Sequence, residues 1–259
     1  KYAQNHFSKN KLVYFDNHRV VKKNISVLTS ILKNALIKRS ETERMAGDFG
    51  SIAPKKLWQI GRTSRPQKLF ERTVKRDESD FVVDVLIDGS GSQSSRQGKV
   101  ALQAYILSEA LSALKIPHRI MSYCTFWEYT VLIRLRDYDD PQSKNSRIFE
   151  YMTSSNNRDG LAVKAACDAL LQRGEENKIL IVLSDGRPND ININNPNATH
   201  NILYTGEAAI KDTAHEVRAA RELGISVLGV FAGEEDDLAA EKLIFGKDFA
   251  YIRNISNFS

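Results

Sequence analysis

Three short apolar runs constrain the fold of this chain more than any other feature of its sequence. They are Phe81–Ile87, Lys178–Leu183 and Ile225–Phe231, and helix-like patterns separate them. Strands that are apolar along nearly their whole length, and that alternate with helices, are typical of a parallel sheet covered on both faces. We therefore predict an α/β fold with a doubly wound, mostly parallel sheet and helices on both faces.

Weaker patterns complete this sheet and suggest a boundary upstream of it. Apolar periodicity predicts further helices at 100–115, 161–171, 207–223 and 236–245, and further strands at 119–126, 128–135 and 249–252. A three- and four-residue apolar repeat predicts another helix over 24–45. We place a domain boundary near residue 78. The expected organisation is a small, basic, partly helical N-terminal segment at 1–78 and the main domain at 79–259.

Composition and charge exclude some classes of protein. No apolar stretch is long enough to span a membrane, so we expect no membrane span. Cys124 and Cys167 lie in apolar patterns and are expected to be reduced core residues of a cytoplasmic protein. Residues 1–80 carry a net charge of +10 and residues 81–259 one of −5. The basic part is either a solvated surface or a contact for an acidic partner. Aromatic residues do not alternate with the basic ones, so nucleic acid is not expected.

Oxygen-bearing side chains gather in three loops that the predicted topology brings to one edge of the sheet. The run 88–92 (DGSGS) follows the first apolar strand, 157–160 (NRDG) precedes a helix, and 184–186 (SDG) follows the second apolar strand. Ligands of such sheets bind beyond the carboxyl ends of the strands. The candidate metal ligands are Asp88, Ser90, Ser92, Asp159 and Asp185. Each loop taken alone is also compatible with a simple turn or a helix cap.

A donor set made only of oxygen suits a hard cation. Mg²⁺ is the expected ion, and Mn²⁺ or Ca²⁺ would also fit. Because Ser90 and Ser92 contribute neutral hydroxyl groups, the ion would keep positive charge and attract one further carboxylate. The sequence therefore predicts a site that binds an acidic side chain of a partner protein.

The chain resembles the von Willebrand factor A domain over residues 81–259. Asp88-x-Ser90-x-Ser92 matches the first motif of that family's metal-ion-dependent adhesion site, and Asp159 and Asp185 fit the two later positions. The resemblance implies a Rossmann-like fold with this metal site. Longer matches resemble the branch that contains nitric oxide reductase activation proteins and the cobaltochelatase large subunit. They lie at 157–160, 183–190 and 212–221.

This resemblance also implies partners. Proteins of that branch are cytoplasmic and work with a MoxR-type AAA+ ATPase to activate or metal-load a client metalloenzyme. We expect this chain to be the non-catalytic, metal-dependent protein-binding member of such a pair. Asp159 stands where integrins have a threonine, which makes the ligand set more anionic.

Two alternatives stay open at this stage. One is a domain of the same fold that binds no metal and serves as a scaffold. The other is a magnesium-dependent phosphatase-like hydrolase, in which Asp88 would accept a phosphoryl group. Such hydrolases usually carry a second aspartate two residues later, where this chain has Ser90. The sequence also lacks a phosphate-binding Gly-x-x-x-x-Gly-Lys loop and a Gly-x-Ser-x-Gly elbow. We therefore assign no catalytic residue.

Overall fold

The computed structural model describes residues 2–40, 43–47, 50–52, 70–74, 80–127, 129–193, 202–231 and 238–251. The chain divides into two compact units. One consists of Lys1–Ser30 together with Phe81–Ser259, and the other of Ile31–Asp80. The first, which we call the main unit, contains every candidate ligand. The sequence-based division into 1–78 and 79–259 stays a prediction.

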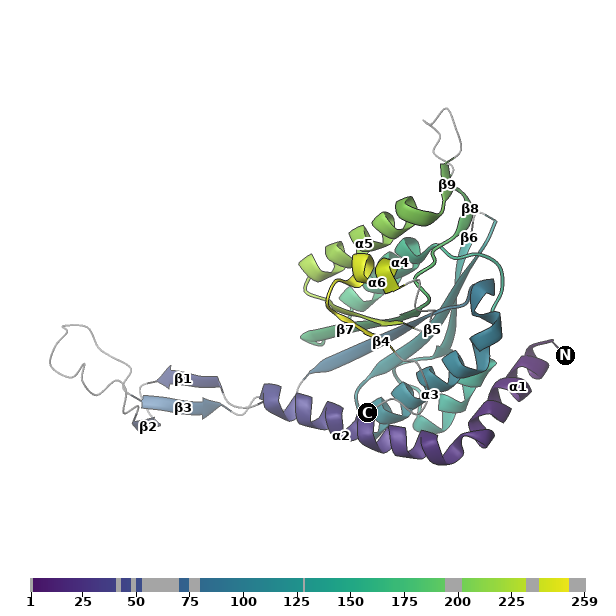
Figure 1. Cartoon of the computed structure of the whole chain (residues 1–259). Coiled ribbons are helices and arrows are strands. Elements are labelled where there is room, and N and C mark those ends of the chain that lie inside the picture. The colour runs from purple at the N-terminus through teal and green to yellow at the C-terminus, as the bar shows by residue number, and fades with distance from the viewer. Residues whose placement is uncertain are drawn as a thin grey trace. The chain divides into compact units, whose positions relative to one another are not determined.

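A six-stranded sheet forms the centre of the main unit, in the order β11-β10-β7-β4-β5-β6 (Figure 1). The strands are β4 (Phe81–Asp88), β5 (His118–Phe126), β6 (Tyr129–Arg136), β7 (Asn177–Ser184), β10 (Ser226–Phe231) and β11 (Phe249–Tyr251). Neighbouring strands are parallel except β6, which runs antiparallel to β5. The predicted doubly wound, mostly parallel sheet is confirmed.

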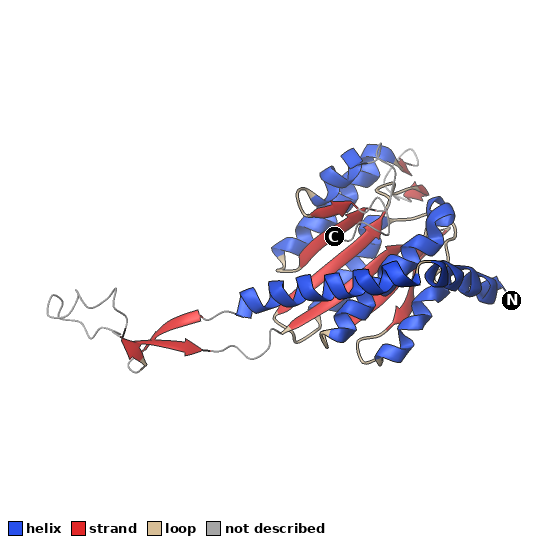
Figure 2. Cartoon of the chain, turned by 60° about the horizontal axis from the view of Figure 1, so that its bottom comes forward, coloured by secondary structure: helices blue, strands red, loops and turns tan. Residues whose placement is uncertain are grey.

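Helices cover both faces of this sheet (Figures 1 and 2). They are α3 (Gln97–Ala113), α4 (Asp159–Leu171), α5 (Gly206–Glu222) and α6 (Leu238–Phe245), with 3-10 helices η2 (Gly91–Arg96) and η3 (Gln142–Glu150). Val82 and Leu86 of β4 pack with the apolar faces of α4, α5 and α6 in one buried cluster. Helix α3 lies on the opposite face with α1 (Tyr2–Asp16) beside it. None of the helices among the described residues has the length and apolarity needed to cross a membrane.

The N-terminal region is more helical than its sequence predicts. Helix α1 was not expected, because its apolar residues do not recur on one side of a helix. In the structure, Leu12 and Phe15 of α1 are each 60% exposed. Polar and aromatic contacts together hold the helix in place: the Asn10 side-chain amide donates to the carbonyl oxygens of Phe149 (2.9 Å) and Tyr151 (2.7 Å), and the Tyr14 ring packs against those of Tyr105 and Phe149. The helix predicted over 24–45 is α2 (His18–Ser40), which starts earlier and ends earlier.

Short strands account for the remaining described segments. In the second unit, β1 (Glu43–Gly47), β3 (Phe70–Val74) and β2 (Ser51–Ile52) form an antiparallel sheet in the order β1-β3-β2. In the main unit, β8 (Asp190–Ile193) pairs with β9 (Ile202–Tyr204). Both cysteines are buried and form no disulfide, as expected.

One aspartate lies in the middle of the central strand. Asp84 is fully buried and accepts hydrogen bonds from the Arg119 guanidinium (Nε at 3.2 Å) and from the Tyr138 hydroxyl (2.6 Å). Arg119 lies opposite Asp84 in the register of β5 with β4. A buried carboxylate is tolerated when an opposite charge and hydrogen bonds compensate it. This ion pair therefore explains how an almost apolar strand accommodates a charge.

Replacing Asp84 by alanine should leave the Arg119 guanidinium buried without its carboxylate. We expect Asp84→Ala to lower the free energy of unfolding by about 3–5 kcal/mol, as is typical when one partner of a buried pair is removed. Urea denaturation measures this loss, and Asp139→Ala, at an exposed position, is the matched control. A loss below about 1 kcal/mol, the range of an exposed ion pair, would contradict the structural role of Asp84.

Candidate metal-binding site

Two neighbouring parallel strands bring the candidate ligands to the carboxyl edge of the sheet. Strand β4 ends at Asp88 and the adjacent strand β7 ends at Ser184, directly before Asp185. After Asp88 the chain turns tightly at Gly89, whose backbone amide donates a hydrogen bond to the Tyr123 carbonyl oxygen at 2.7 Å. A Cβ at Gly89 would lie 2.7 Å from the same oxygen, so only glycine fits there. This turn directs Ser90 and Ser92 back over the end of the sheet.

Four of the five candidate ligands form one continuous chain of oxygen atoms. Asp88 Oδ2 accepts a hydrogen bond from Ser90 Oγ at 3.0 Å. Ser90 Oγ is 2.8 Å from Ser92 Oγ, which donates to Asp185 Oδ2 at 2.6 Å. Backbone amides fix the two carboxylates: Ser90 N donates to Asp88 Oδ1 and Arg187 N to Asp185 Oδ1. The structure therefore brings residues 93 positions apart in the sequence into direct contact.

The fifth candidate, Asp159, is linked to this chain of oxygens by an amide. Asn157 Nδ2 donates to Asp159 Oδ1 at 2.8 Å and lies 3.5 Å from Asp88 Oδ2. The Ser184 hydroxyl contacts the other oxygen of Asp159 at 3.3 Å. Asp159 thus lies beside the other ligands, with both of its oxygens already hydrogen-bonded.

The spacing of these oxygens fits a small octahedral cation. Mg²⁺ binds oxygen at 2.0–2.1 Å, so adjacent ligands of an octahedron are about 2.9 Å apart. The three oxygen–oxygen contacts from Asp88 to Asp185 measure 3.0, 2.8 and 2.6 Å, which are ordinary lengths for O–H···O hydrogen bonds and also lie near this octahedral spacing. In the described part of the chain, no three His, Cys, Asp or Glu side chains are grouped as in a conventional metal site. The fit therefore depends on the two serine hydroxyls, and assignment of the five residues as ligands stays a prediction.

The site concentrates negative charge away from water. Asp88, Asp159 and Asp185 are each at most 2% exposed. Burial, followed by the charges of Asp159 and Asp185, raises the pKa of Asp88 well above its usual range. Burial likewise raises the pKa of Asp159 to about 7. Among the described residues, the only ion pair made by these carboxylates joins Arg96 to Asp185 at 3.9 Å. The cluster is therefore short of positive charge.

Sequence reasoning missed a fourth carboxyl group near this cluster. Glu241 of α6 is fully buried, and neither of its side-chain oxygens has a hydrogen-bond partner. Burial, with smaller contributions from Asp159 and Asp185, raises its pKa to about 9. The only available signal was helical spacing, because Glu241 shares the buried face of α6 with Ile244 and Phe245. Because glutamate is rarely buried, the sequence pattern alone did not predict a buried position for Glu241.

The protonated state of Glu241 makes stability depend on pH. Its pKa is higher in the folded than in the unfolded protein, so its contribution to stability is complete below about pH 4 and is lost as the pH rises through about 9. The expected loss is about 1 kcal/mol per pH unit. Glu241→Gln should remove this slope, as measured by urea denaturation between pH 6 and 9. Glu222→Gln, at an exposed position of the neighbouring helix α5, should keep it. Equal slopes in both variants would contradict the assignment.

Protonation of the aspartates makes metal binding depend on pH as well. A cation replaces protons on these carboxylates, and the pKa of Asp159 is about 7 in the metal-free protein. We expect Mg²⁺ affinity to rise by about tenfold or more between pH 6 and pH 8, with release of protons. Calorimetric titrations in two buffers of different ionisation enthalpy measure both quantities. Affinity that is equal at the two pH values would contradict a role for Asp159.

Comparisons with known proteins agree with this architecture. Residues 83–259 match the family described as von Willebrand factor type A domain. The uncharacterized protein YojO of Bacillus subtilis (strain 168) is 26% identical over 216 residues, which are 77% of this chain and 32% of that protein. The chain thus spans about a third of the length of this relative.

Solved structures show the same fold at low sequence identity. The open conformation of the pilus adhesin SpaC from Lactobacillus rhamnosus GG has a TM-score of 0.53 at 13% identity, covering 71% of this chain and 29% of that one. The vWF domain of the type V pili tip protein Mfa5 from Porphyromonas gingivalis also has a TM-score of 0.53, at 12% identity, covering 70% and 93%. The sheet order, the carboxyl-edge loops and the family match agree: the chain belongs to the von Willebrand factor type A domain family.

Proposed function

We propose that this protein is a metal-dependent protein-binding module. Mg²⁺ would be held by Asp88, Ser90, Ser92 and Asp185, with Asp159 beside them. The ion would then bind a carboxylate of a partner protein. The observation that carries this proposal is the chain of oxygens from Asp88 to Asp185, with contacts of 2.6–3.0 Å. Domains of this family are typically metal-dependent interaction modules rather than enzymes.

Charge and access support the same proposal. The carboxylates are buried, whereas Ser92 is exposed, so the donor set opens to solvent on the serine side. A cation there would compensate the buried negative charge. Its remaining coordination position would face outwards, where a partner can reach it. Mn²⁺ and Ca²⁺ use the same kinds of oxygen ligands and are alternatives.

The proposed partner is a MoxR-type AAA+ ATPase, and the pair would activate or metal-load a client metalloenzyme in the cytoplasm. Support comes from the sequence resemblance at 157–160, 183–190 and 212–221. The chain has no phosphate-binding loop of its own, so ATP hydrolysis would belong to the partner. Within the third match, Asp212 accepts a hydrogen bond from Tyr204 at 2.7 Å and packs against Gly160, next to Asp159. This match therefore contributes to the packing behind the candidate site.

Neutralising Asp88 should separate the cost of the buried charge from the benefit of the metal. We expect Asp88→Asn to raise the melting temperature of the metal-free protein, because an amide carries neither the repelled charge nor the cost of protonation that raises the pKa of Asp88 in this buried cluster. The same change should abolish stabilisation by Mg²⁺, which amounts to about 2.7 kcal/mol when the ion is at one hundred times its Kd. Thermal melts in EDTA and in MgCl₂ measure both effects.

The control for this experiment is Asp139→Asn, which changes an exposed carboxylate outside the site. It should keep the full response to Mg²⁺. If none of Mg²⁺, Mn²⁺ and Ca²⁺ raises the melting temperature of the parent protein, the result would favour the alternative of a scaffold domain that binds no metal. An Asp88→Asn variant that responds like the parent would exclude this residue as a ligand.

A further inference from the structure

An exposed apolar patch lies at the turn between β5 and β6. It consists of Phe126, Trp127, Tyr129 and Val131, which are 41%, 87%, 73% and 40% exposed, and we call it the aromatic tip. We infer that the aromatic tip binds an apolar side chain of the same partner whose carboxylate reaches the metal site. The inference rests on the proposed function and specifies the partner: an acidic residue with an apolar residue close to it in sequence.

The aromatic tip projects from the same edge of the sheet as the candidate ligands. Asp88 lies opposite Tyr123 in the register of β4 with β5, and β5 continues to Phe126. At about 3.3 Å per residue, those three further residues extend β5 about 10 Å beyond the end of β4. The tip thus forms a wall next to the site. A partner segment that reaches the metal passes along this wall.

Hydrogen bonds connect the tip directly to the loop that carries Asp159. Thr125 N donates to Asn156 O at 2.7 Å, and Asn156 N donates back to Thr125 O at 3.2 Å. Arg158 N donates to the Thr125 hydroxyl at 3.2 Å, and that hydroxyl is 3.0 Å from the Thr130 hydroxyl. The base of the tip is therefore fixed relative to the site. A preorganised surface loses little conformational freedom when a partner binds.

The exposure of Trp127 is a second indication of function. Its φ is +53°, a left-handed conformation that is rare for a bulky residue. Packing does not explain the choice of tryptophan, because the side chain is 87% exposed. Tryptophan and tyrosine are the residue types most enriched where protein partners bind tightly. The hairpin accounts for the positive φ, because Phe126 pairs with Tyr129 across a two-residue loop and such loops need a left-handed first residue. The exposed indole at this position is what fits a recognition residue.

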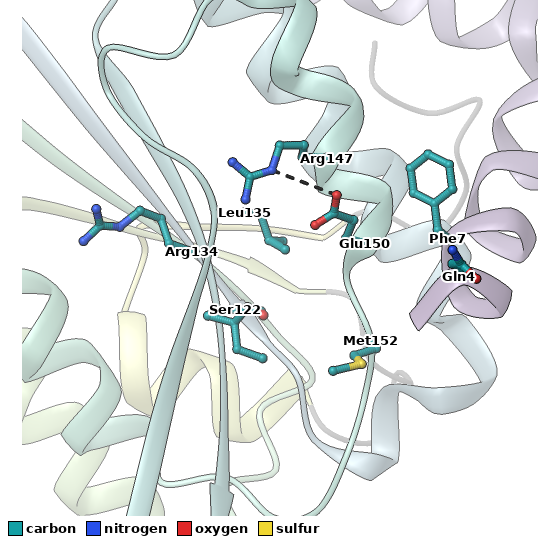
Figure 3. A pocket seen from close by; sticks show the side chains of 9 residues that line it. Gln4, Phe7, Ser122, Arg134, Leu135, Arg147, Glu150 and Met152 are labelled. Carbon is teal, nitrogen blue, oxygen red and sulfur yellow. Dashed lines mark ion pairs between the residues drawn. The ribbon is translucent and has the colours of Figure 1, made fainter. Parts of the chain in front are cut away.

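A cavity lies further along the same face of the hairpin, away from the tip residues. Phe126 lies opposite Tyr129, and Ser122 opposite Ile133, so alternation places all four on one face of the hairpin. Ser122 and Ile133 line a cavity of about 630 Å³ together with side chains of α1, η3 and the segment after η3, among them Phe7, Glu150 and Met152 (Figure 3). An apolar segment bound at the tip could extend into this cavity.

The charges around the site specify the sign of the partner. Arg96, Arg158 and Arg187 lie on the loops that surround the candidate ligands. Arg96 is 3.9 Å from Asp185, and Arg158 forms an ion pair with Asp190. Because Arg96 and Arg158 each pair with a carboxylate of the chain itself, the charge that would attract an acidic partner is that of the proposed cation, which has room for one further carboxylate. The partner segment is therefore acidic and carries an apolar side chain roughly three or four residues from the metal-binding carboxylate, which matches the 10 Å offset.

Selection from a displayed library of random 12-residue peptides tests this inference on the whole chain. The parent is panned in MgCl₂ and in EDTA, beside Asp88→Asn and the double variant Trp127→Asn/Tyr129→Thr. Asparagine tolerates positive φ and threonine favours strands, so the double variant should melt like the parent. Leu243→Thr changes a side chain of α6 that is 66% exposed and serves as the matched control.

We expect enriched peptides to carry Asp or Glu with Phe, Leu or Trp three or four residues away. They should bind the parent and Leu243→Thr equally, and should lose at least tenfold in affinity for the double variant, for Asp88→Asn and in EDTA. Mg²⁺-dependent peptides that bind the double variant as tightly as the parent would overturn the tip's role and leave the proposed function intact. A selection that yields no Mg²⁺-dependent peptide would contradict both. Dimerisation of the parent, abolished in the double variant, would assign the tip to a second copy of this chain and overturn the inference.

Discussion

Repulsion between buried carboxyl groups at one edge of the sheet is the interaction that most affects the stability of this structure and its proposed affinity for a metal. Two serine hydroxyls connect Asp88 to Asp185 there, the Asn157 amide connects Asp159 to Asp88, and buried Glu241 has no hydrogen-bond partner. Burying a charge without compensation costs several kcal/mol. The protein reduces this cost with serine hydroxyls and backbone amides, and the raised pKa values of Asp88 and Asp159 favour their protonated forms. A divalent cation would reduce it further, so the feature that destabilises the metal-free protein is also the one that would give it affinity for a metal.

The central strand shows how the environment separates a structural acid from a functional one. Asp84 and Asp88 lie four residues apart on β4, so both point to the same face, and both are fully buried. Asp84 meets a guanidinium and a phenol, which together compensate its charge. Asp88 meets hydroxyls, amide groups and further carboxylates. The first arrangement is complete without a ligand, whereas the second would gain stability from a bound cation.

The sequence was sufficient to predict the sheet and the loops at its carboxyl edge. Nearly apolar strands have few alternative placements, and topology then fixes which loops meet. It was insufficient where polar contacts or exposure decide the structure. Asn10 anchors α1 through hydrogen bonds that leave no periodic pattern, and Glu241 occupies a position that an apolar residue normally fills. Three residues of the aromatic tip were predicted only as parts of two strands and Trp127 fell between those strands, because sequence alone does not show which apolar residues stay exposed.

In the proposed function, a metal and the aromatic tip would together bind one partner segment. The central claim is that a cation binds between Asp88, Ser90, Ser92 and Asp185. The most direct measurement is a crystal structure of the chain soaked in MnCl₂, with anomalous diffraction data collected at the manganese edge. The account predicts one anomalous peak about 2.2 Å from the two serine hydroxyls, close to the carboxylates. Diffraction that places manganese elsewhere, with the serines still hydrogen-bonded to the aspartates, would contradict it.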